Sequence, residues 1–121
     1  MSDLGPALRR GAELFDAGRF LEAHETWEEH WRGLARPSAA ASLMQGLAQC
    51  AAAAHKLRRG ELRGARSLAR KGASTLQSAL QDERLRATGL ALDPFIDGMR
   101  RIGESDAGID AVLPRLLTKD G

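Results

Sequence analysis

The chain has 121 residues, of which 43% are apolar and 28% are charged, and its formal net charge at pH 7 is +2. This length is typical of one domain with a single core, and so small a net charge does not by itself indicate a nucleic-acid-binding protein. One cysteine excludes an internal disulfide bond and is consistent with a reducing compartment. We expect Cys50 to be a small buried hydrophobic residue, because it lies in an apolar alanine run.

No basic-then-apolar leader opens the chain, so we expect no signal peptide. The longest apolar run, Leu43–Leu57, is shorter than the roughly 18 residues of a membrane span, and Gln45 and Gln49 interrupt it. These features predict a cytoplasmic protein without a membrane partner.

An alanine-rich composition without strand patterns predicts an all-α fold, as a single helical domain over residues 1–121. Apolar residues spaced three and four apart divide the chain into helical segments. In chain order these segments are residues 5–17, 19–34, 39–59, 61–83, 94–102 and 107–117. We expect the first four to form two main helical hairpins in a bundle, and the last two to form a smaller C-terminal helical pair.

Several residues mark the ends of these segments. Gly18 suits a turn, because glycine adopts positive φ at no steric cost. Ser38 is a candidate N-cap for the helix that follows it. Asp106 is a candidate N-cap for residues 107–117, a segment that Pro114 must kink or split.

A short pattern, Gly-x-Phe/Leu-x-x-Ala, occurs twice in the chain. It begins at Gly18 and again at Gly60, 42 residues later. Two copies are too few for a solenoid of stacked repeats. The repeat therefore supports two helical hairpins packed together.

The second predicted helix holds the most informative residues. Its apolar residues recur at three- and four-residue steps, the pattern of a core-facing amphipathic helix. His24 falls just inside the edge of this apolar stripe, and Glu28, one turn later, falls just outside it. The stripe consists of Phe20, Ala23, Trp27, Trp31 and Leu34.

An imidazole and a carboxylate four residues apart on a helix can bind one cation. We expect His55, on the third helix, to join His24 and Glu28 as a third ligand of Zn²⁺, Mn²⁺ or Fe²⁺, with one position open for water. Glu25 is then the nearest candidate general base. The string His24-Glu25-Thr26-Trp27-Glu28 is close to the zincin motif. Glu28 stands where that motif has its second histidine, so the zincin mechanism does not carry over.

The same residues carry a family resemblance. The string Gly-x-Phe-x-Glu-Ala-His-Glu-x-Trp-Glu-x-x-Trp begins at Gly18, and Gln45-Gly46-Leu47 and His55 follow it. Over about residues 8–83 the chain resembles the bacterial and archaeal family of small helical proteins known as "domain of unknown function three-oh-nine". The resemblance implies an all-helical fold. Because that family is labelled a predicted metal-dependent hydrolase, it also implies hydrolysis of a small-molecule substrate.

We expect the site to include a small pocket beside the motif. For the two tryptophans, packing in the core is the ordinary alternative. The residues that we expect to line the pocket are Trp27, Trp31, Gln45, Gly46 and Gln49.

A non-enzymatic interpretation stays open. A histidine at the margin of an apolar face is often a neutral core residue with both nitrogens hydrogen-bonded, and Glu28 or Gln49 can be the partner of His24. The cluster is then a polar network that fixes how two helices cross. Under this alternative the protein is a helical-hairpin module that binds a protein partner or a second copy of itself.

Charge is unevenly distributed along the chain. Residues 56–71 contain seven Lys and Arg against Glu61, whereas residues 13–29 contain six acidic residues against Arg19. A basic run of this kind can bind nucleic acid. No aromatic residue is interleaved with it to stack on bases, so we interpret it as a solvated helix face and expect no nucleic-acid partner.

Overall fold

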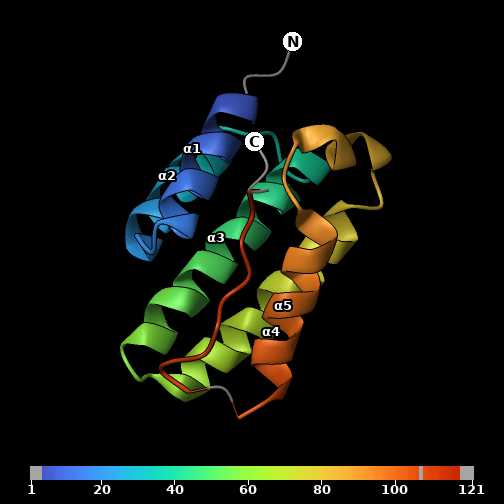
Figure 1. The fold of residues 1–121 in the computed structure, drawn as a ribbon. Helices are drawn as coiled ribbons and strands as arrows, with labels where there is room; N and C mark the ends of the chain where they lie inside the picture. Colours follow the sequence, from blue (N-terminus) through green and yellow to red (C-terminus); the bar gives the residue numbers. More distant parts are fainter. Residues whose placement is uncertain (1–3, 107, 118–121) are drawn as a thin grey trace.

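The computed structural model describes residues 4–106 and 108–117. In chain order the helices are α1 (Leu4–Asp16), α2 (Phe20–Arg32), α3 (Ala39–Arg58), α4 (Leu62–Ala79), the short 3₁₀ helix η1 (Glu83–Thr88) and α5 (Leu92–Glu104) (Figure 1). The described residues include no strand. The prediction of an all-α protein is therefore confirmed.

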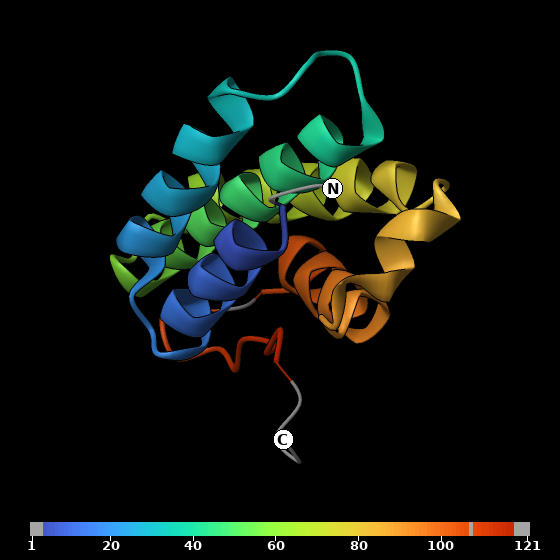
Figure 2. The same ribbon diagram turned by 90° about the horizontal axis from the view of Figure 1, so that it is seen from above.

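The third helix, α3, is the centre of the bundle. It packs against α2 on one side and α4 on the other, while α1 pairs with α2 and α5 pairs with α4 (Figures 1 and 2). Leu43, Leu47 and Leu57 of α3 are fully buried, as expected for a helix between two neighbours. The two main hairpins are thus α1–α2 and α3–α4. None of the described helices is long and apolar enough to cross a membrane.

The two hairpins are closed by the same kind of turn. Gly18 and Gly60 have φ angles of +83° and +80°, a region that favours glycine. The next residue begins the following helix with nearly the same angles in both turns, φ −94° and ψ 69° at Arg19 and φ −86° and ψ 70° at Glu61. The backbone hydrogen bonds around the two turns also correspond. The sequence repeat is therefore a structural repeat.

Small residues let α3 and α4 approach closely. A Cβ atom built on Gly72 would lie 2.6 Å from the Sγ atom of Cys50, and one built on Gly46 would lie 2.8 Å from the side chain of Leu76. Cys50 is fully buried, as predicted, and burial raises the pKa of its thiol. A thiol that stays protonated in the core is a packing group rather than a nucleophile.

The fourth helix ends earlier than predicted. It stops at Ala79 instead of residue 83. The carboxylate of Asp82 then accepts the backbone N–H of Arg84 at 3.1 Å and caps η1. The hydrogen bonds from Arg84 also hold the pKa of the Asp82 carboxyl below its usual value.

The prediction of a C-terminal helix is wrong for residues 108–117, which form no helix. Ala107, the first residue of that predicted segment, lies outside the described residues. The segment instead runs past α3 between α1 and α5 (Figures 1 and 2). Pro114 contributes to this outcome, because proline lacks the N–H that a helix needs. The C-terminal pair is therefore η1 and α5, followed by a non-helical segment.

Side chains from the two hairpins hold this C-terminal segment. The guanidinium of Arg58 donates to the carbonyl oxygens of Ile109 and Ala111 at 2.8 and 2.9 Å. The carboxylate of Asp16 accepts the backbone N–H groups of residues 116 and 117, each at 2.9 Å. These bonds satisfy backbone groups that a helix would pair internally. Because the partners are distant in the chain, sequence periodicity alone could not show that the segment is non-helical.

Candidate functional site

His24 lies at the contact between α2 and α3. Its Nδ1 atom is 3.0 Å from the main-chain oxygen of Ala48, and its side chain is 25% exposed. Because a carbonyl oxygen can only accept, Nδ1 is the donor, which leaves a free lone pair on Nε2 of the neutral ring. The contact with α3 therefore sets both the orientation and the tautomer of the imidazole.

Glu28 supplies the second group, one turn further along α2. Its Oε1 atom is 3.5 Å from Nε2 of His24 and 3.3 Å from Nη2 of Arg32. The first distance exceeds the roughly 2.7–3.2 Å of an N–H···O hydrogen bond. It is close to the distance of about 3.4 Å between two ligand atoms of a tetrahedrally coordinated metal ion. With the ring neutral, both facing atoms are acceptors, so a proton or a cation between them is needed for attraction.

The structure does not bring the predicted third ligand to this pair. His55 lies on α3 seven residues beyond Ala48, the residue that His24 contacts, which is about 10 Å along the helix axis. Within residues 4–106 and 108–117, no group of three or more His, Cys, Asp and Glu side chains is placed to hold a metal ion. Of the three expected ligands, the structure therefore brings His24 and Glu28 together.

The predicted general base, Glu25, is exposed. No hydrogen bond or ion pair joins it to another described residue. Helical geometry turns it about 100° from His24, on the side of the α2 helix away from its buried face. Its role as a base stays a prediction.

A surface hollow of about 360 Å³ adjoins the pair at the C-terminal end of α2, and we call it the Trp31 hollow. It lies one helical turn from the pair, since Trp31 follows Glu28 by three residues and Gln45 precedes Ala48 by three. Trp31 and Gln45 line it, as expected of the predicted pocket. The full lining is Trp31, Arg36, Pro37, Ser38, Ala41, Ser42 and Gln45.

Sequence reasoning did not assign three polar residues to this hollow, namely Arg36, Ser38 and Ser42. Ser42 precedes Gln45 by one turn of the same helix, so helical spacing was a signal that could have found it. Arg36 lies in a loop, where no periodicity applies. Its guanidinium carbon is 4.5 Å from the centroid of the Trp31 ring, so the cation stacks on the indole.

Three residues expected to line the pocket lie elsewhere. Trp27 is fully buried, and its indole packs against Gly11 of α1, so it belongs to the core. Gly46 faces Leu76 of α4, where a larger residue would separate the two helices. Gln49 is partly buried, and its Oε1 atom has no hydrogen-bond partner among the described residues. The hollow therefore lies nearer the loop that joins α2 to α3 than the predicted pocket.

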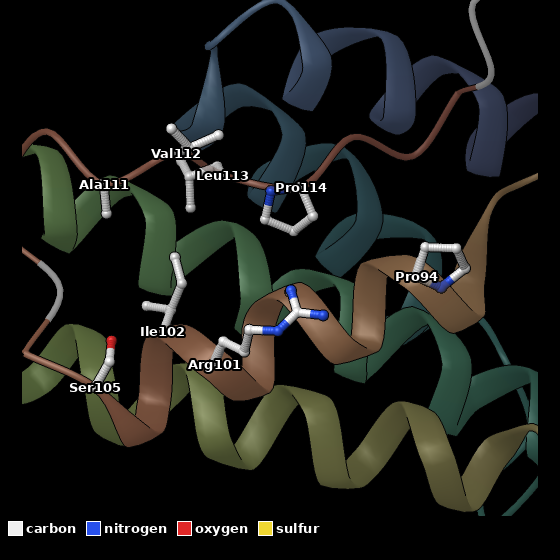
Figure 3. Close-up of a pocket in the computed structure, with 9 residues that line it drawn as sticks. Pro94, Arg101, Ile102, Ser105, Ala111, Val112, Leu113 and Pro114 are labelled. Carbon is white, nitrogen blue, oxygen red and sulfur yellow. The ribbon is translucent and has the colours of Figure 1, made fainter.

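Another hollow, of about 480 Å³, lies between α5 and the C-terminal segment (Figure 3). Ile102 points from α5 toward the segment, and the guanidinium of Arg101 extends toward Pro114. The other lining residues that Figure 3 labels are Pro94, Ser105, Ala111, Val112 and Leu113. None of the residues expected to be functional lines this hollow.

The fold and the seam between α2 and α3 define a small helical-hairpin protein with a partly exposed histidine–glutamate pair. Residues 8–68 match the model of the family described as "Domain of unknown function (DUF309)". This match covers half of the chain, and the protein belongs to that family. It includes α2, α3 and the Trp31 hollow, and it ends before α5. No curated protein matches the chain.

Proposed function

We propose that the protein binds one divalent metal ion between His24 and Glu28 and catalyses metal-assisted hydrolysis of a small molecule. The observation that supports the proposal is the 3.5 Å separation of Nε2 and Oε1. Two acceptor atoms at this separation fit a shared cation better than a direct hydrogen bond. The family match indicates no activity, because the function of that family is unknown. The proposal therefore rests on the geometry of the pair.

The surroundings of the pair suit a metal ion. The carbonyl of Ala48 accepts from Nδ1 of His24, which is the kind of outer contact that orients a metal-binding imidazole and increases its basicity. Imidazole nitrogen together with carboxylate oxygen suits zinc, manganese or iron. Both side chains are partly exposed, so coordination positions remain for water and for a substrate.

A bound metal ion would lower the pKa of a coordinated water and supply a nucleophile at neutral pH. His24 and Glu28 would hold the ion, and Arg32 keeps the carboxylate of Glu28 in place through their ion pair. Glu25 is the residue that we propose as general base, because it directly follows His24 and its carboxylate is open to solvent.

Metal analysis of protein purified without chelator or affinity tag tests the site. We expect near-stoichiometric zinc, manganese or iron in the unchanged protein and its loss in His24→Ala and Glu28→Gln. His30→Ala is the matched control, since it removes a partly buried histidine of the same helix. His55→Ala should also keep its metal. Equal metal content in His24→Ala and in the unchanged protein would contradict the proposal.

Hydrolysis is tested separately from binding. Chromogenic carboxylic esters and phosphate esters are offered to the metal-loaded protein, to the chelator-treated protein and to Glu25→Gln. We expect turnover that disappears on chelation and falls in Glu25→Gln, while the metal content of Glu25→Gln stays unchanged. Turnover that persists after chelation would contradict a metal-dependent reaction.

One observation favours a second candidate, the non-enzymatic hairpin module with a structural polar network. The hydrogen bond between Nδ1 of His24 and the carbonyl of Ala48 joins α2 to α3, whether or not a metal binds. If this bond is the main role of His24, metal-free His24→Ala should lose about 0.5–1.5 kcal/mol of unfolding free energy. No variant would then change the metal content. Chemical denaturation beside the metal analysis separates the two candidates.

A further inference from the structure

We infer that the Trp31 hollow binds an oxyanion, the carboxylate or phosphate group of a small molecule, through Arg36. The inference rests on the proposed function in one respect, because it assigns this group to the molecule that reacts at His24 and Glu28. The hollow has a volume of about 360 Å³, which suits part of a small ligand.

Charge is the first argument. Among the described residues that line the hollow, Arg36 carries the only formal charge. No carboxylate of a described residue pairs with it, whereas Arg32 and Arg86 have acidic partners within 3.3 Å. The N–H donors of Arg36 are therefore not engaged by another residue of the described chain, and an anionic ligand can take them.

The stacking of Arg36 on Trp31 is the second argument. The guanidinium carbon lies over the face of the indole, 4.5 Å from the ring centroid. The N–H groups donate to no described residue, so the cation can stay over the ring and donate two parallel hydrogen bonds to a carboxylate or a phosphate. Stacking also restricts the long side chain before a ligand arrives, which lowers the entropy lost on binding.

Neutral donors complete the lining. The hydroxyl of Ser42 and the amide of Gln45 face the same hollow, and no hydrogen bond joins either side chain to a described residue. The side chain of Ser38 accepts the backbone N–H of Ala41 at 3.1 Å, which places the beginning of α3 at the wall of the hollow. The partial positive charge of a helix beginning adds to that of Arg36.

The position of the hollow links it to the histidine–glutamate pair. Trp31 lies one turn, about 5 Å, beyond Glu28 on α2. A molecule with its oxyanion at Arg36 can therefore place a bond a few atoms away beside His24 and Glu28. The negative charge of Glu28 opposes an anion nearby, and a cation bound to Glu28 removes that opposition. Anion affinity should accordingly increase when the metal is present.

Tryptophan fluorescence of the metal-free protein tests the hollow, with inorganic phosphate and acetate as probes at constant ionic strength. Trp31 reports on Arg36, whereas Trp27 is buried away from the hollow. We expect a saturable change that Trp31→Phe removes, and an affinity at least about tenfold weaker in Arg36→Gln. Arg63→Gln is the matched control, because it removes an exposed arginine from α4, on the other side of α3.

The two probes identify the group. Saturation by phosphate alone assigns a phosphate, saturation by acetate alone assigns a carboxylate, and saturation by both assigns a site for either oxyanion. No saturation with either probe, or equal affinity in Arg36→Gln and the unchanged protein, overturns the inference. Circular dichroism checks that each variant is folded.

The failure of this inference can be told from the failure of the proposed function. Arg36→Gln should lose anion binding and keep its metal, while His24→Ala should be purified without metal and should still bind the anion. In a final arm, added zinc should tighten acetate binding to the unchanged protein but not to His24→Ala. If zinc does not change the acetate affinity of the unchanged protein, the link between the hollow and the pair is overturned.

Discussion

The α1–α2 and α3–α4 hairpins have the same turn but different crossings. The turn glycines, Gly18 and Gly60, have nearly equal positive φ angles. In the first hairpin the large indole of Trp27 lies against Gly11, whereas in the second small residues such as Gly72 bring the two helices together. The first hairpin thus depends on one large side chain of α2 and carries the candidate site on the flank of that helix. The α3–α4 hairpin depends on the close approach of its two backbones, and it supports the α1–α2 hairpin through the contact of α3 with α2.

The two hairpins also share the task of holding the C-terminal segment. Asp16 and Arg58 are equivalent positions of the repeat, 42 residues apart and two residues before the turn glycine. Asp16 accepts N–H groups of the segment, and Arg58 donates to its carbonyl oxygens. Equivalent positions of the repeat therefore bind opposite kinds of backbone group in one non-helical segment.

The largest expected effect is at the crossing of the first hairpin. Trp27→Ala should lower the unfolding free energy by about 3–5 kcal/mol, because it removes a fully buried aromatic side chain and leaves a cavity. Trp27→Phe is the matched control and should cost less, since the indole N–H has no hydrogen-bond partner among the described residues. Urea denaturation measures both. Equal losses in the two variants would show that the first hairpin does not depend on the volume of this side chain.

A smaller effect is expected where the hairpins hold the C-terminal segment. Asp16→Ala should cost about 2–4 kcal/mol, because it leaves two backbone N–H groups without their charged partner, and the Asp16 side chain is only 5% exposed. Arg58→Ala should cost less, about 0.5–1.5 kcal/mol, because its bonds are exposed to water. Denaturation of both variants checks the order. A larger loss in Arg58→Ala would reverse the roles of the two positions.

A comparable or smaller loss should follow from adding one methyl group at each crossing. Gly72→Ala and Gly11→Ala should each cost about 1–3 kcal/mol by overpacking. At Gly72 the added Cβ meets backbone atoms at 3.1 and 3.2 Å as well as the Cys50 thiol, so Cys50→Ala should restore only part of the loss. At Gly11 the three nearest atoms all belong to the indole of Trp27, so Trp27→Phe should restore more. Double-mutant cycles measure the difference, and equal restoration would contradict it.

The smallest effect is expected at the second turn, where Glu61 replaces the Arg19 of the first. Hydrogen bonds from Arg59 and Lys56 hold the pKa of Glu61 below its ordinary value of 4.5. A lowered folded-state pKa gives a stabilisation that is present above pH 4.5 and is lost as the pH falls through the folded value. Glu61→Gln should therefore flatten the loss of stability in acid. Urea midpoints of both proteins, measured from neutral pH to below pH 4.5, test this prediction. The difference in midpoint between Glu61→Gln and the unchanged protein should shrink in high salt, because Glu61 is exposed.

Much of the fold followed from local patterns. Apolar spacing predicted the helices, and the glycine pattern predicted two related hairpins, because a positive-φ turn is a local requirement that glycine meets. The burial of Cys50 was also predicted, since its neighbours along α3 are small and apolar. His24 and Glu28 were expected to lie together, because a four-residue step on a helix places side chains one above the other.

The remaining features required the tertiary structure. Helical periodicity identifies the residues that share a face, but it does not say which neighbour covers that face. Gly46 was therefore expected in the pocket although it faces α4. The sequence of a helix likewise does not determine its position along the axis of a neighbouring helix. The sequence therefore predicts His55 beside His24, although the two lie at different levels of the bundle.

The amino-acid sequence by itself determined the all-α class, the two hairpins with their glycine turns, and the histidine–glutamate pair, because all of these depend on residues within a few positions of each other. Only the tertiary structure decided that no third ligand among the described residues joins the pair, that Arg36 stacks on Trp31, and that residues 108–117 form no helix. These three features depend on packing and hydrogen bonds between residues that are distant in the chain or that lie in a loop, where helical periodicity carries no information.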